Sequence, residues 1–411
     1  MRIIIHKDFN KLRIFAFIYW GMIISVGGMY TMYISQIGFH KEEMGITVTL
    51  YSVSMLVGHS FLGYLVDKLR CIKKIMLSSI SIGLIIAAGL PLARLNWQVC
   101  LLIAMWGFFI GGASTLFDTW CISTLKAYGE QNNFGKIRGF GSVGYGLSGA
   151  LLGLLLSKFG WNIYYLYIAA VVMFTLIIIY INDDRHIENM RDKSPNVSIK
   201  EALTQILKIK PFIIMLIIVF TYNFIYMGIY NYLGVLVKDY GGGALSLGLT
   251  YFFDAAPEIV TYFLTASLLK KYKNKSLIFV AFLLQAIRLV VIYIFSNALA
   301  VMLMGILSGF AFGLMDASYK TYIYDLAPEK YKTSCLSLFD CIVGFSGIIC
   351  APIFGFLFVR LGTNAIIVFA LIIDIIMASV MLINMLYPVM SRKGFSKCKT
   401  TIKSENTNNV R

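Results

Sequence analysis

The sequence predicts an all-α membrane protein of twelve transmembrane helices arranged in two six-helix halves. Two observations support this prediction. Hydrophobic residues make up 59% of the 411-residue chain and charged residues only 14%, whereas a soluble domain carries about 25% charged residues. A helix needs about 20 apolar residues to cross a bilayer, and the chain contains twelve apolar stretches of that order. These observations exclude a soluble globular protein.

The predicted spans follow one another along the chain with short polar loops between most of them. They cover residues 13–37, 45–67, 75–93, 98–126, 135–157, 162–181, 211–237, 247–269, 276–296, 298–324, 334–359 and 362–387. The longest polar interruption leaves six spans on each side. The predicted domains are an amino-terminal half at 1–181, a cytosolic linker at 182–210, a carboxyl-terminal half at 211–387 and a basic cytosolic tail at 388–411.

The distribution of Lys and Arg predicts the orientation of the chain. With both termini in the cytosol, the cytosolic segments contain 29 of these residues and the outer loops contain 5. Short cytosolic loops of membrane proteins carry an excess of Lys and Arg, so we predict this orientation in the cell membrane. The same distribution accounts for the net charge of +16 without nucleic acid as a partner.

The sequence lacks the motifs that enzymes and metal proteins use. The seven cysteines are scattered, and the chain has no CxxC pair and no His/Cys cluster, so we expect neither disulfides nor a metal site. We find no nucleophile–base arrangement and no nucleotide-binding loop, which argues against an enzyme and against an ATP-driven pump. We expect no cofactor, and we expect a monomer whose partners are the lipid bilayer, a small solute and protons.

Charged residues inside the spans are the first candidates for function, because each costs several kcal/mol in a bilayer unless it is paired or lines water. They are Asp118, Asp254, Glu258, Arg288, Asp316, Lys320, Asp340 and Asp374. At 1.5 Å per residue, Glu258 lies about 18 Å from Lys270 and Arg288 about 20 Å from Lys275. This predicts similar depths for Glu258 and Arg288 near the midplane, where they form either a proton-coupling pair or a fixed structural ion pair.

Two further acids belong to this group. Asp254 lies one turn before Glu258 and can share a proton with it. Asp316 lies four residues before Lys320, so the two side chains share a helix face and can neutralise each other. Weaker candidates are Asp340, Asp374 and His59.

A glycine-rich stretch from Phe134 to Gly153 contains Arg138 near its start. Glycines spaced four residues apart, such as Gly149 and Gly153, let helices in a membrane approach closely. The run F-G-K-I-R-G-F-G-S-V-G in this stretch resembles the entry to the fifth helix of lactose permease. It is similar to the wider oligosaccharide/nucleoside:proton symporter branch of the major facilitator superfamily. The resemblance extends along essentially the whole chain, through span count, loop charges and local motifs.

The resemblance implies a major facilitator fold and roles for four residues of the first half. Arg138 would pair with Asp118 on the preceding span, and the two would bind solute or, alternatively, close a cytosolic gate. Ser142 and Tyr145 stand where lactose permease has a substrate-protected cysteine and a sugar-stacking tryptophan. A tyrosine can still stack on a ring, and it offers a hydroxyl group.

The loop after the second span also resembles that of the superfamily. Gly63, Asp67 and Lys68 match its G-x-L-x-D-[RK]-x-G-[RK]-[RK] pattern, which implies a role for them in conformational change. The chain departs from the pattern at Arg70, which replaces the second glycine.

The proton relay implied by the resemblance must differ from that of lactose permease. There, an arginine at the position of Arg288 belongs to the proton-coupling group. Ser308 and Ala311 stand where lactose permease has a histidine and its proton-carrying glutamate. The remaining acids, Glu258 or Asp316, are therefore the expected proton carriers.

Aromatic residues on the seventh span provide a candidate solute surface. Tyr222, Tyr226 and Tyr230 recur every four residues, and Asn223 lies beside them. A face of tyrosine and asparagine inside a membrane suits a ring-bearing, hydroxylated solute. The alternative interpretation is helix packing together with anchoring at the membrane interface.

These features predict a secondary active transporter that imports a small polar solute (a sugar, an oligosaccharide or a nucleoside) in symport with protons by alternating access. Two alternatives stay open. One is a drug or metabolite:proton antiporter for efflux, although such carriers usually have a proline-containing glycine motif in the fifth span, which has no proline here. The other is a non-transporting membrane sensor, or a protein that moves lipid-linked material; paired charges at matching depth argue against a passive receptor.

The charge distribution generates a prediction about topology. Reporters fused at Arg185 and at the carboxyl end are expected to report a cytosolic location, and a reporter fused after Lys158 is expected to report the outside, because the cytosolic segments carry most of the basic residues. Paired cytosolic and extracytosolic reporter activities measure this. An external signal from the carboxyl end would refute the count of twelve spans.

Overall fold

The computed structural model describes residues 2–130, 133–182, 210–326 and 332–383. Helices make up nearly all of this part of the chain, and no strand occurs in it. Most of the predicted linker and all of the predicted basic tail lie outside the described residues.

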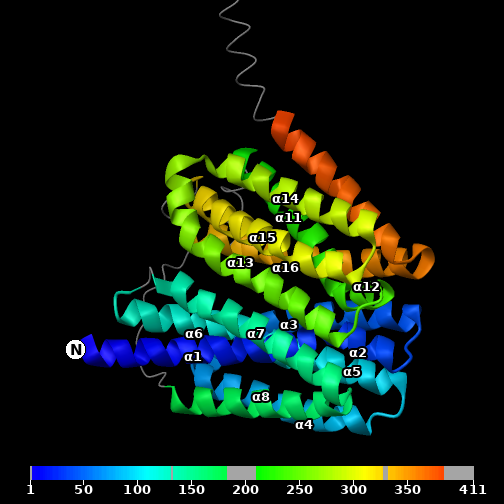
Figure 1. Ribbon diagram of the computed structural model, residues 1–411. Coiled ribbons are helices and arrows are strands. Elements are labelled where there is room, and N and C mark those ends of the chain that lie inside the picture. Colours follow the sequence, from blue (N-terminus) through cyan, green and yellow to red (C-terminus); the bar gives the residue numbers. More distant parts are fainter. Residues whose placement is uncertain (1, 131–132, 183–209, 327–331, 384–411) are drawn as a thin grey trace, which may run out of the picture.

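The first half contains the helices that precede the linker. They are α1 (Arg2–Gly27), α2 (Tyr30–Gln36), α3 (Lys41–Leu69), α4 (Ile72–Gly89), η1 (Leu90–Leu92), α5 (Asn96–Trp106), η2 (Gly107–Gly111), α6 (Ser114–Ala127), α7 (Phe134–Phe159) and α8 (Asn162–Ile181). These helices form the lower group in Figure 1.

The second half forms the upper group in Figure 1. Its helices are α11 (Lys210–Asn231), α12 (Leu233–Asp239), α13 (Ala244–Lys271), α14 (Asn274–Phe295), α15 (Ala298–Leu326), α16 (Lys332–Leu361) and a last described helix, Thr363–Ile383. The division into two groups follows the predicted linker.

Eleven segments of the described chain are long and apolar enough to cross a membrane. Helix α13 is not one of them, although its 28 residues span about 42 Å, because Asp254, Pro257 and Glu258 interrupt its apolar middle. With α13 counted, the described chain has the twelve predicted spans, and the predicted fold class is confirmed.

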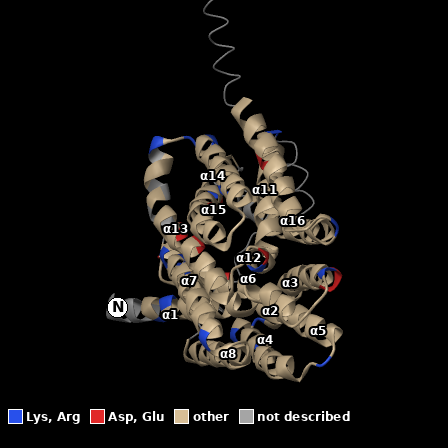
Figure 2. Ribbon diagram, turned by 45° about the vertical axis from the view of Figure 1, so that its right-hand side comes forward, with Lys and Arg blue, Asp and Glu red and all other residues tan. Residues whose placement is uncertain are grey.

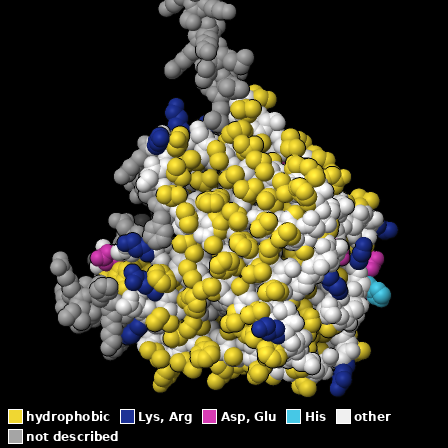
Figure 3. Space-filling view, viewed as in Figure 1, with side chains coloured by type: hydrophobic (Ala, Val, Ile, Leu, Met, Phe, Trp, Pro, Cys, Tyr) yellow, Lys and Arg dark blue, Asp and Glu magenta, His cyan; other side chains and the backbone are white. Residues whose placement is uncertain are grey.

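The surface of the bundle agrees with this count. The ribbon in Figure 2 is mostly free of charged residues in the middle of the helices, and Lys, Arg, Asp and Glu gather mainly near helix ends. The face in Figure 3 is covered by hydrophobic side chains over most of its area. Such a surface is compatible with a bilayer and would be unfavourable in water.

The helix is interrupted within three of the predicted spans. The first span divides into α1 and α2 around Gly28 and Met29, and the seventh divides into α11 and α12 at Tyr232. A broken helix leaves backbone groups without intrahelical partners, and the carbonyl of Gly28 accepts a hydrogen bond from the Tyr251 hydroxyl at 2.7 Å. The first helix of each half is thus interrupted at an equivalent position.

The fourth span is interrupted by the π-helix η2 between α5 and α6. At this point the backbones of two helices touch, since a Cβ atom on Gly58 of α3 would overlap the Phe108 carbonyl oxygen. The next residue, His59, places Nε2 3.1 Å from the Gly111 carbonyl oxygen and 3.0 Å from Ser114 Oγ. His59 is therefore an imidazole packed at this helix contact.

The loop motif that resembles the superfamily lies at the end of α3. Gly63 is within the helix, and Asp67 and Lys68 are exposed in its last turn. Arg70 caps the helix with φ 53°, a left-handed conformation that glycine adopts at lower cost. Arg70 therefore adopts the left-handed turn that the second glycine of the superfamily pattern would favour. The predicted conformational role of these residues stays a prediction.

The two halves meet most extensively along α7 and α13, which lie side by side in the centre of Figure 1. A Cβ atom on Gly248 of α13 would overlap the Gly149 carbonyl oxygen of α7 and lie 3.0 Å from the Cα of Gly153. Only glycine permits this backbone contact. The predicted close approach at Gly149 and Gly153 is confirmed, and the partner helix is α13.

The other contacts between the halves gather at the same end of the bundle, where α7 ends and α13 begins; this is called the closed end below. There, α2 packs against α12, and the ammonium of Lys238 donates hydrogen bonds to the Ser35 carbonyl at 2.7 Å and to its hydroxyl at 2.8 Å. Helices α3 and α16 also pack together. Three helices of each half therefore contribute to the contact.

The backbone contact at Gly248 generates a prediction about stability. Gly248→Ala is expected to destabilise the protein by about 1–3 kcal/mol, because an overpacked contact forces the backbones apart. The melting temperature of the purified protein in detergent measures the change.

Gly139→Ala is the matched control. This α7 glycine has no neighbouring atom within 4 Å of an added Cβ, so the change is expected to be neutral or to stabilise the helix by up to about 1 kcal/mol. Equal melting temperatures for the two variants would contradict the assigned contact.

Candidate solute and proton site

A ladder of tyrosine rings joins the two halves. Tyr145 of α7 packs edge-on against Tyr251 of α13 with ring centroids 5.9 Å apart, and Tyr251 lies 5.6 Å from Tyr230 of α11. Along α11, Tyr230, Tyr226 and Tyr222 stack in turn at 5.7 and 6.3 Å. The predicted tyrosines from both halves thereby lie in one continuous row, the tyrosine ladder.

Tyr251 is the link in this ladder that the sequence analysis missed. It is buried, and it precedes Asp254 by three residues and Glu258 by seven. That spacing puts all three residues on one face of α13. This helical spacing from the two acids is the sequence signal that could have indicated Tyr251.

Carboxylates of α13 lie beside the ladder. The hydroxyl of Tyr226 donates to Oδ2 of Asp254 at 3.3 Å, and the charges of Asp254, Glu258 and Arg288 all act on this hydroxyl. Arg288 and Ser308 lie close to Asp254. The structure therefore places Tyr226 next to the predicted proton-coupling residues.

Helices α13 and α14 follow each other in the chain, but a third helix separates them. Helix α15 packs extensively against both of them and lies between them in Figure 1. Arg288 is 3% exposed, and its Nη1 donates to Gln285 Oε1 of its own helix at 3.5 Å. The direct pairing of Glu258 with Arg288 stays a prediction.

Several buried polar atoms of this cluster have no hydrogen-bond partner in the described part of the chain. They are the Tyr222 hydroxyl, Asp254 Oδ1, Gln285 Nε2 and Arg288 Nε. Leaving such a group unsatisfied costs about 1–3 kcal/mol, and native proteins avoid it except where water, an ion or a ligand binds. The cluster therefore has the polar capacity to bind a solute or water. Gln285, three residues before Arg288 in an otherwise apolar span, was not predicted.

Asp316 has a different environment from Asp254. Its carboxylate forms an ion pair with Lys320 at 2.7 Å and accepts a hydrogen bond from Tyr319 at 3.3 Å. The predicted neutralisation of Asp316 by Lys320 is confirmed. Asp316 is thus already paired within α15, whereas Asp254 accepts a hydrogen bond from Tyr226 of the tyrosine ladder.

Asp374, a weaker candidate from the sequence, is deeply buried. It lies in the last described helix with a fully buried side chain, and neither carboxylate oxygen has a hydrogen-bond partner among the described residues. Its charge acts on the Tyr222 hydroxyl. Asp374 thus adjoins the second-half end of the ladder, whereas the side chain of Asp340 lies outside the described part of the structure.

The first half contributes an arginine held by an aromatic ring. The guanidinium carbon of Arg138 lies 3.9 Å from the ring centroid of Trp20 on α1, and Nη1 is 3.5 Å from the Ser142 hydroxyl. The sequence did not predict Trp20 as the partner of Arg138. Asp118 lies on α6, and its predicted pairing with Arg138 stays a prediction.

Asn223 is oriented by its own helix. The side chain is buried, and its amide donates to the Val219 carbonyl at 2.9 Å. Its predicted contact with solute stays a prediction. The described residues include no group of three or more His, Cys, Asp or Glu side chains that could hold a metal ion.

The family follows from a comparison of the sequence with known families. The sequence model of the MFS_1 like family matches residues 9–345. The chain belongs to the MFS_1 like family. The predicted membership of the major facilitator superfamily is confirmed, and its relatives are transporters rather than enzymes.

Two curated relatives of this MFS_1 like protein are similar over long stretches. An uncharacterized transporter, YwbF of Bacillus subtilis, is 22% identical over 347 residues, which is 84% of this chain and 84% of YwbF. The maltose permease of Geobacillus stearothermophilus is 22% identical over 255 residues, which is 62% of this chain and 64% of the permease.

Solved structures agree on the fold of this MFS_1 like protein. The nucleoside transporter NupG superposes with a TM-score of 0.74 at 15% identity, and a mutant of NupG superposes with a TM-score of 0.76 at 14% identity. Each comparison covers 91% of this chain and 98% of the other. At these identities the likeness establishes the fold alone.

The stacking of Arg138 on Trp20 generates a prediction for this MFS_1 like protein. Arg138→Lys is expected to weaken solute binding by about tenfold or more, because an ammonium reproduces neither the planar stacking nor the forked donor geometry of a guanidinium. Equilibrium binding of a transported solute to the purified protein measures the affinity. Unchanged affinity with an altered transport rate would instead assign Arg138 to a gate.

Proposed function

We propose that this protein is a proton-coupled symporter that imports a small hydroxylated, ring-bearing solute, either a saccharide or a nucleoside. One observation carries the proposal: the tyrosine ladder crosses between the halves and contacts, at Tyr226, a buried group of ionisable residues on α13 and α14. Aromatic faces bind sugar and nucleobase rings. Buried ionisable groups in a transporter mark proton and substrate pathways.

The solute class is supported by both halves of the site. In the first half, Arg138, Ser142 and Trp20 offer hydrogen-bond donors and an aromatic face. In the second half, the unsatisfied polar atoms of Tyr222 and Gln285 can form hydrogen bonds with hydroxyl groups of the solute. A maltose permease and a nucleoside transporter among the similar proteins favour the same class.

Coupling requires that protonation of an acid favour one conformation over the other. A carboxylate near the midplane is stable as an anion while a guanidinium compensates its charge. If solute draws Arg288 away, the neighbouring acid gains a proton. Glu258 and Asp254 are the proposed proton carriers, because the charge of Arg288 acts on Asp254 and the charges of both acids act on Tyr226. Asp316 ranks after them as a proton carrier, because it is already paired with Lys320.

The proposed orientation completes the mechanism. The protein is a monomer in the plasma membrane, with both termini in the cytosol. In this orientation the closed end faces outside. The present conformation is then the one in which solute has no access from outside. Alternating access proceeds by separation of the halves at this end and their approach at the other.

Solute-induced proton uptake tests the proposal. Purified protein in vesicles carrying an internal pH dye is offered maltose, a nucleoside and an aromatic acid in turn. Addition of a transported sugar or nucleoside is expected to acidify the vesicle interior as protons enter with it. Solute accumulation without any proton flux would overturn symport, and acceptance of the aromatic acid alone would overturn the solute class.

The coupling role of Glu258 generates a further prediction. Glutamine imitates the protonated acid but cannot release a proton, so Glu258→Gln is expected to bind and exchange solute across vesicles yet fail to accumulate it under an inward proton gradient. Glu258→Asp is expected to retain part of the accumulation. Uptake of radiolabelled solute, with and without the gradient, measures both variants. If Glu258→Gln accumulates solute as the wild type does, the coupling site moves to Asp254 or Asp316.

A further inference from the structure

A groove of about 520 Å³ runs between α3 of the first half and α16 of the second, and it begins at the closed end. Its floor is a backbone contact, because a Cβ atom on Gly45 would lie 3.7 Å from the Cα of Gly355. The groove therefore lies directly over a junction between the halves.

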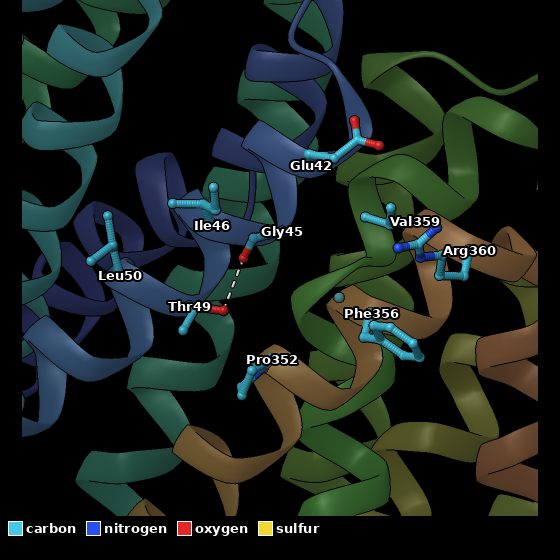
Figure 4. Close-up of a pocket in the computed structure, with 10 residues that line it drawn as sticks. Glu42, Gly45, Ile46, Thr49, Leu50, Pro352, Phe356, Val359 and Arg360 are labelled. Carbon is cyan, nitrogen blue, oxygen red and sulfur yellow. Dashed lines mark hydrogen bonds between the residues drawn. The ribbon is translucent and has the colours of Figure 1, made fainter.

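The walls of the groove are apolar and face outward. Ile46 and Leu50 of α3 are 57% and 42% exposed, and Phe356 of α16 is 63% exposed. The hydroxyl of Thr49 is occupied, since it donates to the Gly45 carbonyl at 2.9 Å, as Figure 4 shows. On two membrane-spanning helices such an outward-facing groove is in contact with hydrocarbon, so its natural occupant is an acyl chain.

The mouth of the groove carries one charge of each sign. Glu42 is in the first turn of α3 and Arg360 is in the last turn of α16, and Figure 4 shows both at the same end of the groove, with Leu50 and Pro352 at the other. Both side chains are exposed. In the described part of the chain, neither side chain forms a hydrogen bond or an ion pair.

A phospholipid head group complements this arrangement. A phosphate diester matches the forked donors of a guanidinium, and a primary ammonium can donate to a carboxylate. An anionic head group would satisfy Arg360 but leave Glu42 opposed to a negative charge. A choline head group carries no N–H donor for Glu42.

We infer that this groove binds one phosphatidylethanolamine molecule, with its phosphate on Arg360, its ammonium on Glu42 and one acyl chain between α3 and α16. The bound lipid touches both halves at the closed end. A ligand that binds one conformation better shifts the equilibrium toward it, so the lipid stabilises the conformation in which this end is closed. The inference does not depend on which solute is transported.

Lipid-dependent thermal stability tests the inference. The full-length protein, delipidated in detergent, is titrated with phosphatidylethanolamine, phosphatidylcholine or phosphatidylglycerol of identical acyl chains. Because binding to the folded state raises its apparent stability, the melting temperature is expected to rise most with phosphatidylethanolamine. Native mass spectrometry of the same samples counts the lipid molecules that stay bound.

Three variants separate the head-group contacts. Arg360→Gln is expected to weaken the affinity for phosphatidylethanolamine about tenfold or more, the worth of a hydrogen bond to a charged group. Glu42→Gln is expected to abolish the preference for phosphatidylethanolamine over phosphatidylglycerol while binding of both persists. Lys158→Gln removes an exposed cation from the last turn of α7, at the closed end but outside the set of residues that line the groove, and is expected to behave as the wild type.

Two results would overturn the inference. One is an equal response of the wild type to all three lipids, which means that no head-group contact exists. The other is a loss of lipid response in Lys158→Gln as large as in Arg360→Gln, which means that general surface charge attracts the lipid. Solute transport by the same variants is measured separately, after reconstitution into vesicles, so failure of the lipid site is distinguishable from failure of the proposed symport.

Discussion

The backbone contact between α7 and α13 is the constraint on which the rest of the site depends. Glycines at 149, 153 and 248 bring the two helices together without intervening side chains. Only because the helices touch can Tyr145 of the first half reach Tyr251 of the second, and Tyr251 in turn orders the break in the first span through the Gly28 carbonyl. A packing device that is ordinary for membrane helices thereby determines where aromatic and polar side chains from two halves can meet.

The polar cluster beside the ladder is costly to maintain in a membrane protein. Water is scarce in the interior of the bundle, so each buried charge needs a compensating group nearby. Asp254 has Tyr226, Ser308 and Arg288 around it, yet one of its oxygens and the Nε of Arg288 lack hydrogen-bond partners in the described structure. A cluster built only for stability would satisfy these atoms or replace them with apolar side chains. Its incomplete hydrogen bonding is consistent with a site that receives a proton, water or solute.

Much of the fold was predictable from the sequence, because length, hydropathy and charge act locally. The twelve spans, the helical face of Tyr222, Tyr226 and Tyr230, and the pairing of Asp316 with Lys320 each depend on residues close together in the chain. The helix break at Gly28 was not predictable in this way, because the Tyr251 hydroxyl that donates to the Gly28 carbonyl comes from another helix. The same holds for Trp20 under Arg138 and for α15 between α13 and α14. Spacing in the sequence indicates which residues share a helix face, but it does not indicate which other helix packs against that face.

The contacts that hold the closed end together differ in strength, and this difference bears on conformational change. The α7–α13 contact is a close backbone fit, and a gap of about 0.5–1 Å between the helices already forfeits roughly a quarter to a half of its dispersion energy. The polar contacts between the halves are one hydrogen bond from Tyr251 to Gly28 and two from Lys238 to Ser35. Each is worth about 1 kcal/mol, or somewhat more for those of the charged ammonium. No buried ion pair between the halves occurs among the described contacts. A junction of this kind is specific in geometry and modest in energy, which is what a carrier that must open and close the same interface in every cycle requires.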